Sequence, residues 1–541
     1  MKLDYKKTFY IGLAFFLITL FWQTYDSIIT KILIDKFGLN QTWSGFVMAF
    51  DNVLALFLIP LFGTLSDRQK SKKGRRTPYI IVGTIIAAFV FMGLSFSDNM
   101  QTAKLRTETS ITSDYQLVVD FEDEELSGGE ITQAEWIILQ TTIETEWTGL
   151  LADGVIDQAR FDEFEEEIID SMDVYLLDNN IEQEEENQLK ELYYGYLNQR
   201  AWIQTSQSPI VFVVFVINLF VALLAMAMFR SPTVALMPDV TIKPLRSKGN
   251  AVINLMGTFG GILAIVVLTI FGLDKLSYVN YAPAFIIVGV LMLVLLAIFL
   301  WKVKEPKLVK EREELDVKLG LTEEAEAEEK HESVETLSKE KRRSLILILA
   351  SVFLWFTGYN AVTTKLSDYA PKVLDLGFSM PLLIAQGAAL IAFIPIGILA
   401  TKIGRRKTVL IGIVMLTVCF GSVYFLTPDT ASIMYIIFGL TGIAWATINV
   451  NSYPMVVELA KGSDVGKYTG YYYAFSMAAQ ILTPILSGIL MDNPNLGRTI
   501  LFPYAAFFVA ASFVTMMLVK HGDAKIIGKD SVLENFDVDM D

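Results

Sequence analysis

The chain has 541 residues, of which 53% are hydrophobic and 19% are charged, and its mean hydropathy is +0.45. This composition is too apolar for a soluble protein of this length and indicates a protein that crosses a membrane many times. The formal net charge is −15, and the chain contains a single cysteine, Cys419, and two histidines, His331 and His521. One cysteine excludes a disulfide within the chain, and this set argues against a Cys/His metal site. We expect no metal or other cofactor, no catalytic site and no nucleic-acid partner.

Twelve apolar runs are long enough to cross a bilayer, whose core of about 30 Å requires roughly 20 apolar residues per helix. The first run follows a charged start that resembles a signal peptide, but it lacks a small-residue cleavage site, so we interpret it as a membrane span. The runs are residues 9–30, 43–66, 78–97, 209–229, 250–273, 282–301, 344–362, 382–401, 408–427, 433–456, 470–490 and 499–519.

Lys and Arg are concentrated in the loops at 67–76, 230–248, 402–407 and 461–467. The positive-inside rule places these loops in the cytosol, together with the N-terminus and a mixed-charge linker. We expect a multi-pass protein of the plasma membrane with both termini in the cytosol. The predicted divisions are 1–97 (spans 1 to 3), 98–207 (an insert), 208–302 (spans 4 to 6), 303–343 (the linker), 344–520 (spans 7 to 12) and 521–541 (a cytoplasmic tail).

The insert at 98–207 is predicted to lie outside the cell, between the third and fourth spans. It carries 27 acidic and 5 basic residues, a net charge of −22, which leaves +7 for the rest of the chain. Ile131, Ile156 and Ile181 recur at a spacing of 25 residues, each at a turn before a charged helical segment. This pattern indicates tandem helical repeats that form an acidic cap, open to a protein partner. The segment "DGVID" at 153–157 resembles half of a calcium-binding loop, but not all of the oxygen ligands that a full loop requires are present.

A basic motif occurs twice, as "GTLSDRQKSKKGRRTP" between spans 2 and 3 and as "GILATKIGRRKT" between spans 8 and 9. Repetition at matching positions is typical of secondary transporters and predicts two pseudosymmetric six-helix halves. We interpret the motif as a cytoplasmic latch in which Asp67 pairs with Arg68 or Arg76. The alternative is that these cations only anchor the loop at the membrane surface. The residues assigned to the latch are Gly63, Asp67, Arg68, Gly74, Arg75, Arg76, Arg230, Asp239, Gly397, Arg405, Arg406 and Glu458.

The Gly-x-x-x-Asp-Arg and Gly-Arg-Arg pattern resembles the loop signature of the major facilitator superfamily. "GRRTP", "ALMPDV", "RSKGNAVINLMGTFGG" and "GIAWATINVNSYPMVVEL" are more similar to the glycoside-pentoside-hexuronide:cation symporters and the sucrose transporters. The resemblance covers the twelve spans but not the insert, and it implies co-transport of a sugar with protons or sodium by alternating access. Several sugar symporters carry two acids near the span-2 proline, whereas this chain has only Asp51, nine residues before Pro60. The same group includes lysolipid carriers.

Asp51 and Asp26 are ionisable residues within predicted spans, where a charge costs about 2.5 to 3.5 kcal/mol and is a functional candidate. Asp51 lies well inside span 2, and Asp26 lies five residues before Lys31, nearer the predicted outer interface. We assign both carboxylates to cation coupling, and the alternative for Asp51 is a structural hydrogen bond to a neighbouring helix. Lys365 and Asp368, at the outer end of span 7, are interpreted as interfacial anchors or gate elements.

A sugar site requires amides and hydroxyl groups for the polar rim and an aromatic face for the C–H surfaces. The spans that line the central cavity in the superfamily offer both, although interhelical amide packing is the alternative role for such residues. The candidate substrate-binding residues are Trp22, Gln23, Asn52, Asn218, Asn254, Trp355, Tyr359, Asn360, Trp445, Asn449 and Gln480. Trp43, Trp202 and Trp301 lie at span ends and are assigned to the interfacial aromatic belt.

The sequence therefore predicts an all-α membrane protein with twelve transmembrane helices and an acidic helical insert between helices 3 and 4. The predicted function is import of a glycoside such as a disaccharide, coupled to a proton in preference to sodium. The expected partners are the sugar, the coupling cation and the lipid bilayer, and we expect a monomer. One alternative is a carrier of lysolipids or other amphipaths. The other is a transporter-derived sensor that acts through the acidic insert.

Overall fold

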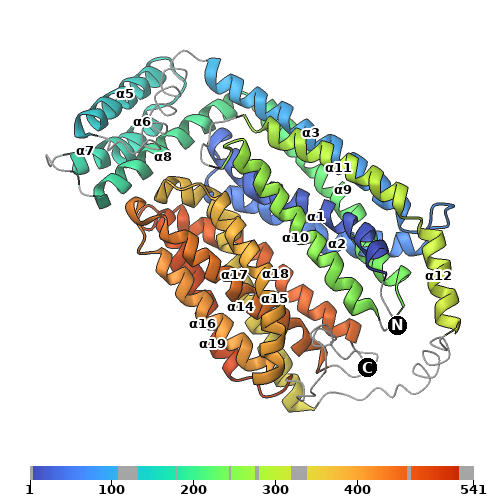
Figure 1. Cartoon of the computed structure of the whole chain (residues 1–541). Helices are drawn as coiled ribbons and strands as arrows, with labels where there is room; N and C mark the ends of the chain where they lie inside the picture. Colours follow the sequence, from blue (N-terminus) through green and yellow to red (C-terminus); the bar gives the residue numbers. More distant parts are fainter. Residues whose placement is uncertain are drawn as a thin grey trace.

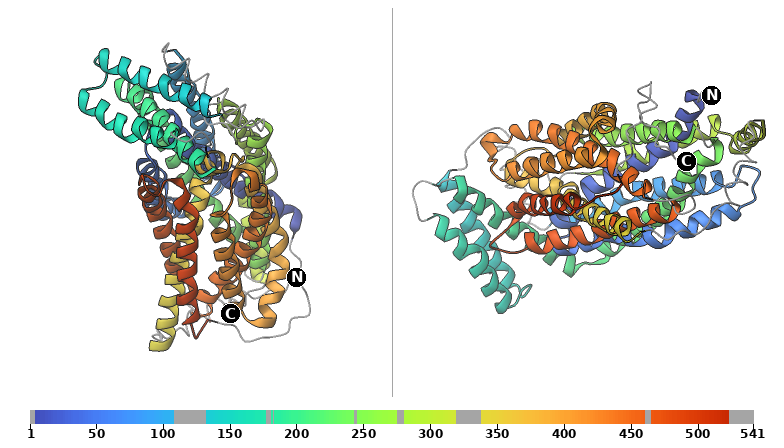
Figure 2. Two further views of the ribbon diagram at one scale, coloured as in Figure 1. Left: turned by 90° about the vertical axis from the view of Figure 1, so that its left-hand side faces the viewer. Right: turned by 90° about the horizontal axis from the view of Figure 1, so that it is seen from below.

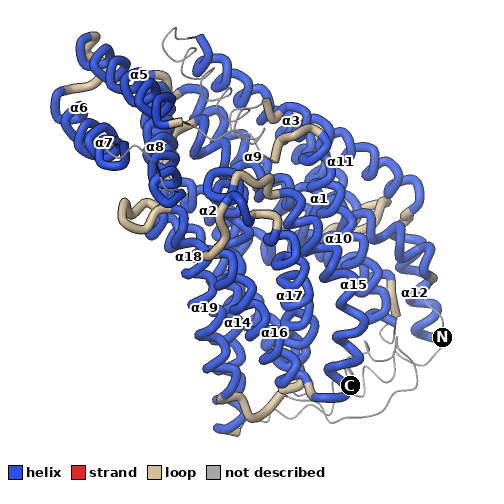
Figure 3. Tube along the Cα trace, turned by 60° about the vertical axis from the view of Figure 1, so that its left-hand side comes forward, coloured by secondary structure: helices blue, strands red, loops and turns tan. Residues whose placement is uncertain are grey.

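The computed structural model describes residues 4–107, 132–176, 181, 183–242, 245–274, 280–318, 338–459 and 465–522. Every regular element in these ranges is a helix (Figure 3). Ile131 and His331 lie outside the described residues, as do most of the predicted cytoplasmic tail and the second half of the linker. Eleven helices of the described chain are long and apolar enough to cross a membrane. A twelfth, α15, has 25 residues and a shorter apolar stretch, Ser379–Phe393, so the helices match the twelve predicted runs.

The first half of the membrane body contains six long helices, and the first of them ends in a short π-helix, η1. These elements are α1 (Tyr5–Lys31), η1 (Ile32–Lys36), α2 (Gln41–Arg68), α3 (Thr77–Thr107), α9 (Ile210–Val240), α10 (Arg246–Ile270) and α11 (Ala282–Lys302). The second half contains α14 (Lys339–Leu374), α15 (Ser379–Ile403), α16 (Arg405–Val423), α17 (Ile433–Val457), α18 (Val465–Met491) and α19 (Leu501–Met517), with the short η4 (Pro428–Thr430) and η6 (Arg498–Ile500). Helix α12 (Glu305–Lys318) follows the first half.

The two halves repeat the same pattern of helix neighbours (Figure 1). In the first half α1 packs against α10, α3 packs against α9 and α11, and α2 packs against α9. In the second half the equivalent pairs are α14 with α18, α16 with α17 and α19, and α15 with α17. Between the halves, α2 packs against α18 and α10 packs against α15. This shared pattern is what an internal repeat of two six-helix units predicts.

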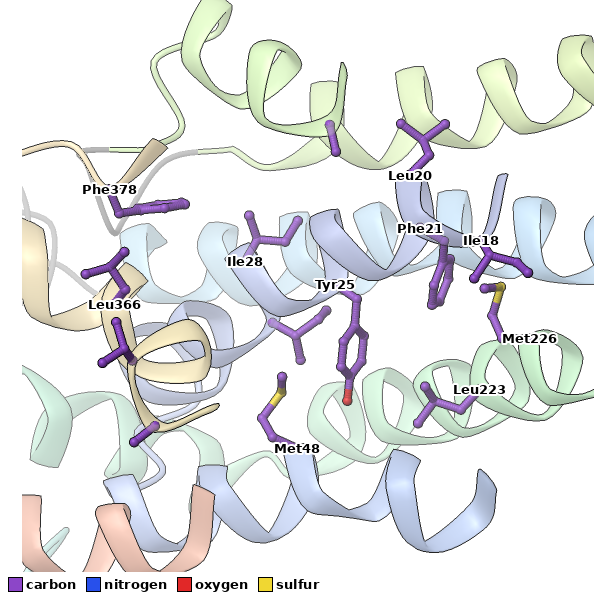
Figure 4. Packing of buried hydrophobic residues seen from close by; sticks show 14 of the residues in the cluster. Ile18, Leu20, Phe21, Tyr25, Ile28, Met48, Leu223, Met226, Leu366 and Phe378 are labelled. Atoms are coloured by element: carbon purple, nitrogen blue, oxygen red, sulfur yellow. The ribbon is translucent and has the colours of Figure 1, made fainter. Parts of the chain in front are cut away.

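Helix α1 runs through the core of the first half and also contacts the second half. In Figure 4, Ile18, Phe21 and Tyr25 of α1 face Leu223 and Met226 of α9, and all five side chains are buried. Helix α1 is apolar on nearly all of its faces, so it can be buried on nearly all of them. The polar residues Thr24, Ser27, Thr30 and Lys31 of α1 are buried inside the protein, whereas Lys6 and Lys7 near its start are exposed.

The insert forms a separate group of helices with its own hydrophobic core. It contains α5 (Gln133–Ala152), α6 (Gln158–Phe164), η2 (Glu165–Ile169), α7 (Asp170–Leu176) and α8 (Gln183–Gln207). Trp147 stacks on Phe164 at 3.8 Å between ring centroids, and both rings are buried. Ile156 is buried in this core and Ile181 packs against it. The described residues of the insert are thus helical and pack around a core of their own.

Figures 1 and 2 place the insert at one end of the long helices, opposite the end where α1 begins. We call these ends the insert side and the termini side. Three helices extend well past their predicted ends: α3 continues past residue 97 to Thr107, α9 past residue 229 to Val240, and α14 past residue 362 to Leu374. In α3 the charge of Asp98 is paired with the buried Lys36 at 2.6 Å. In α9 two prolines, Pro232 and Pro238, lie inside the helix and do not end it.

Candidate transport site and gates

Three charges and a tryptophan meet inside the first half of the membrane body. Asp26 comes from α1, Asp51 from α2 and Arg230 from α9, and their charges interact with one another. The guanidinium carbon of Arg230 lies 5.8 Å from the ring centroid of Trp22, within cation–π range. Both acids lie ten residues from the insert-side end of their helical segments, about 15 Å along a helix axis.

The cluster leaves one negative charge without a matching cation. Asp51 accepts hydrogen bonds from the backbone N of Asn52 at 2.6 Å and from its Nδ2 at 2.7 Å. Among the described residues, Asp26 makes no hydrogen bond, and neither acid forms an ion pair within 4 Å. Two carboxylates and one guanidinium inside a membrane domain favour the uptake of one further positive charge. The arrangement is suited to binding a proton or a small cation.

Arg230 is the principal correction to the predicted site. The sequence analysis assigned it to the cytoplasmic latch because it opens a basic stretch, 230–248. The structure places it within α9, ten residues before the helix ends at Val240, beside Trp22 and the two acids. Asp26 is also deeper than predicted, since Lys31 is buried and the helical segment continues through η1 to Lys36.

An aromatic pair lies in the second half. Tyr359 of α14 and Trp445 of α17 stack with their ring centroids 3.6 Å apart and their planes 8° from parallel, and Phe356 meets Trp445 edge-on at 5.3 Å. Both stacked rings are partly exposed. Beside Tyr359, the side-chain nitrogen of Asn360 is buried without a hydrogen-bond partner. Asn449 lies one turn after Trp445 and is exposed. These residues offer an aromatic surface and free amide groups together.

A pair of glutamines joins the two halves between these groups. Gln386 of α15 donates from Nε2 to Oε1 of Gln23 on α1 at 2.7 Å. Helix α10 comes close at this point, because a Cβ added to Gly261 would lie 3.1 Å from Oε1 of Gln386. The sequence analysis missed Gln386, although an amide in an otherwise apolar span was a usable signal.

The other predicted substrate residues are less closely connected to these groups. Trp355 is fully buried in the hydrophobic core, so it offers no surface to a substrate in this conformation. Gln480 donates to the carbonyl of Ser476 on its own helix at 3.4 Å. Asn218 is half-buried and Asn254 is exposed. Asn52 reaches the site only through its hydrogen bonds to Asp51.

The predicted latch of the first half is assembled at the termini side. Asp239 of α9 accepts from Arg75 Nη2 at 2.6 Å and from Arg76 Nε at 2.7 Å. Arg76 also pairs with Asp67 and donates to Ser66 Oγ at 2.5 Å. Burial alone would lower the pKa of Arg75, but its hydrogen bond to Asp239 and the nearby acids raise that pKa above the ordinary value. The loop is held by a shared carboxylate between two guanidinium groups.

Glu305 at the start of α12 is a latch residue that the sequence analysis did not identify. Its two carboxylate oxygens accept from the backbone nitrogens of Arg75, Arg76 and Thr77 and from Thr77 Oγ1, at 2.7 to 3.1 Å. These donors lie in the loop before α3 and at its first residue, Thr77, and the N-terminus of a helix favours an anion. Gly74 has φ +105°, and a Cβ there would lie 2.2 Å from the Glu305 carboxyl carbon, so the loop needs glycine at this position.

The remaining latch residues form fewer contacts. In the second half, Arg405 Nη1 lies 3.5 Å from Glu458 Oε2, and Arg406 donates to the carbonyls of Met516 and Met517. A Cβ on Gly63 would lie 2.9 Å from Ser231 Oγ, which explains the close approach of α2 and α9. Arg68 is exposed and has no ion pair among the described residues, so Asp67 pairs with Arg76 instead. Gly397 is buried in α15.

A second polar network joins the two halves at the insert side. Lys365 of α14 donates to the Gln41 carbonyl and to Gln41 Oε1 of α2, both at 2.9 Å. Lys372 Nζ lies 2.5 Å from Asp35 Oδ1 in η1 and 2.7 Å from Asp368 Oδ1. Asp368 also accepts from Gln41 Nε2 at 2.6 Å and from Arg498 Nε at 2.8 Å. We call this set the insert-side gate; its residues are buried except for Arg498, which is partly buried.

Comparison with known families identifies the chain. The family model described as Major Facilitator Superfamily matches residues 201–395 and 382–527, which together span more than half of the sequence. The chain belongs to the major facilitator superfamily. The model described as MFS/sugar transport protein matches residues 10–113. Like other members of the superfamily, this protein is a multi-pass membrane transporter and not an enzyme.

Solved structures of the superfamily share the fold of this chain. The inward-open xylose transporter XylE from E. coli is 16% identical, with 98% of this chain and 99% of that chain covered and a TM-score of 0.53. A bacterial homologue of the iron transporter ferroportin, in an inward-facing state, is 11% identical, with 95% and 99% covered and a TM-score of 0.56. At these identities the likeness concerns the fold alone. Within that fold, the acids and Arg230 lie in the first superfamily half, and the aromatic pair lies in the second.

Proposed function

We propose that this transporter imports a glycoside such as a disaccharide together with a cation, a proton in preference to sodium. The observation that carries the proposal is the cluster of Asp26, Asp51 and Arg230, which leaves one carboxylate charge uncompensated inside the membrane domain. A carrier that only exchanged neutral substrates would have no use for such a charge, which is costly in a membrane. The match of residues 10–113 to a sugar-transport family model supports a sugar as the substrate.

The sugar would lie between the two halves. The stacked Tyr359 and Trp445 offer an aromatic surface for its C–H face. The unpartnered amide nitrogen of Asn360 and the side chain of Asn449 offer hydrogen bonds to its hydroxyl groups. Gln23 and Gln386, which bond to each other across the halves, can exchange that bond for bonds to a bound hydroxyl. Binding would in this way connect the two halves through the substrate.

The cation would act on the other side of the same interface. When Asp51 or Asp26 takes up a positive charge, the net charge of the cluster falls to zero, and the cost of burying it falls. Arg230 lies against Trp22, which directly precedes Gln23 in α1. A change in the charge of the cluster can therefore affect the sugar-binding Gln23 through α1 alone. By thermodynamic linkage, the cation raises the affinity for the sugar as much as the sugar raises the affinity for the cation.

The test is uptake into proteoliposomes. A panel of labelled disaccharides would be offered under an imposed pH gradient in one set of vesicles and under an imposed sodium gradient in another. We expect at least one sugar to accumulate under the pH gradient, and protein-free vesicles to show no accumulation. Lack of accumulation under both gradients, by protein shown to be folded, would contradict the proposal and favour lysolipids as substrates.

The placement in the cell follows from the same proposal. Import requires the insert side to face outward, so both termini and the two latches would lie in the cytosol and the acidic insert outside. The basic residues of the loop at 67–76 support this orientation. A protease added to intact cells would reach the insert and not the latches.

A further inference from the structure

The long helix α8 of the insert lies against both halves of the membrane body at the insert side. On the first half, Asn198 donates from Nδ2 to the carbonyls of Ile34 and Leu39, both at 3.0 Å. A Cβ added to Gly38 would lie 2.1 Å from the backbone nitrogen of Trp202, so the chain after η1 runs directly against α8. The Asn198 amide thus satisfies two backbone carbonyls of the first half, and together with the close approach at Gly38 this fixes α8 to that half.

The same helix also contacts the second half through side chains. Lys190 Nζ lies 3.2 Å from Asp375 Oδ2, directly after the end of α14. Glu191 forms an ion pair with Arg498. Tyr194 lies beneath two cations, with Lys372 Nζ 5.1 Å and the Arg498 guanidinium carbon 5.8 Å from its ring centroid.

Two of these three partners, Lys372 and Arg498, belong to the insert-side gate. Lys372 pairs with Asp35 of the first half, and Arg498 pairs with Asp368. The insert therefore adds an anion and an aromatic face to the two gate cations. It also adds a separate ion pair to the end of α14. Without α8, Arg498 would lose Glu191, the second of the two acids with which it forms ion pairs.

We infer that the insert is a working part of the transport cycle: carried by the first half, it holds the insert-side gate shut through Lys190, Glu191 and Tyr194. When the insert side opens, the contacts of α8 to Ile34, Gly38 and Leu39 stay intact and its contacts to Asp375, Arg498 and Lys372 separate. This inference rests on the proposed function, because it requires the two halves to move relative to each other. It gives the insert a role that does not depend on a partner protein.

The test measures gate opening without any substrate. Thr30 of α1 is buried and donates to the carbonyl of Thr364 on α14 at 3.3 Å, so it lies between the halves near the gate. Thr30→Cys would be made in full-length protein that carries Cys419→Ser, which removes the only native thiol. A membrane-impermeant maleimide would be added from the insert side of reconstituted vesicles. The rate of labelling reports how often the gate opens.

The perturbation is the charge-neutral double change Lys190→Gln with Glu191→Gln. Its matched control is Arg160→Gln with Glu163→Gln, which removes an exposed ion pair of 3.6 Å that lies wholly within the insert. We expect the first variant to label about tenfold faster than the parent, since two partly buried ion pairs are lost. The control should label at the parent rate. Equal rates for the two variants would overturn the inference.

The outcome separates this inference from the proposed function. Lys372→Gln breaks the gate at its centre and should also speed labelling. If Lys372→Gln speeds labelling and the α8 variant does not, the gate moves but the insert has no part in it. If sugar uptake is absent and the α8 variant still labels faster, the substrate proposal fails and the role of the insert stands. Thermal unfolding of each purified variant confirms that it is folded.

Discussion

Replacing Glu305 with glutamine should destabilise the first half far more than its single-atom change suggests. The Glu305 carboxylate is buried and accepts five hydrogen bonds from the loop and the first turn of α3. Glutamine keeps one acceptor oxygen, but its other terminal group is an NH2 that faces the N–H and O–H donors of the loop. Two or three of these bonds are therefore lost. Hydrogen bonds to charged groups contribute about 1.5 to 3 kcal/mol each, and such losses are not additive. The helix N-terminus loses about 0.3 to 1 kcal/mol more.

The expected loss for Glu305→Gln is therefore about 3 to 5 kcal/mol of unfolding free energy. The matched control is Glu311→Gln, six residues further along α12, where an exposed carboxylate pairs with the exposed Lys7 at 2.7 Å. Such a surface pair contributes about 1 kcal/mol or less. Thermal unfolding in detergent should show a midpoint lower by several degrees for Glu305→Gln and nearly unchanged for Glu311→Gln. Equal midpoints would refute the argument that Glu305 anchors the latch.

Three further predictions follow from the packing and the site. Gly38→Ala should lower the unfolding midpoint, since φ is +69° and the new Cβ meets the α8 backbone; such strain costs on the order of 1 to 3 kcal/mol. Trp445→Ala should raise the KM for sugar uptake about tenfold, which corresponds to a loss of about 1.4 kcal/mol of binding free energy. The control Tyr359→Phe keeps the aromatic stack and should change this KM little. Asp239→Asn should reduce maximal uptake with little change in sugar binding, because it weakens the latch and not the site.

The fold was predictable because it depends on a property that each segment carries by itself. An apolar run of about 20 residues must become a helix in a bilayer, since its backbone groups have no other partners. The repeated basic motif added the division into halves, and it left Arg68 and Arg76 as candidate partners of Asp67, of which the structure shows Arg76. The insert core was foreseen in part, because the spacing of Ile156 and Ile181 reflects a local helical pattern.

The remaining features depend on contacts between distant residues or on which face of a helix points inward. Arg230 looked like a loop cation because the positive-inside rule counts charge and does not detect that α9 continues through two prolines. Glu305 looked like one of many linker charges, and only the folded chain brings it to Arg75 and Thr77. Trp355 and Trp445 are equally apolar in sequence, yet one is buried in the core and the other is partly exposed.

The most direct test of cation coupling compares two modes of transport in one set of vesicles. Proteoliposomes with Asp51→Asn would be assayed for gradient-driven accumulation of the transported sugar and for counterflow exchange, which needs no net cation movement. The account predicts that accumulation is lost while exchange is retained, because the asparagine cannot take up a charge but leaves the sugar-binding residues in place. Full gradient-driven accumulation by Asp51→Asn would contradict the assignment of Asp51 as the coupling residue.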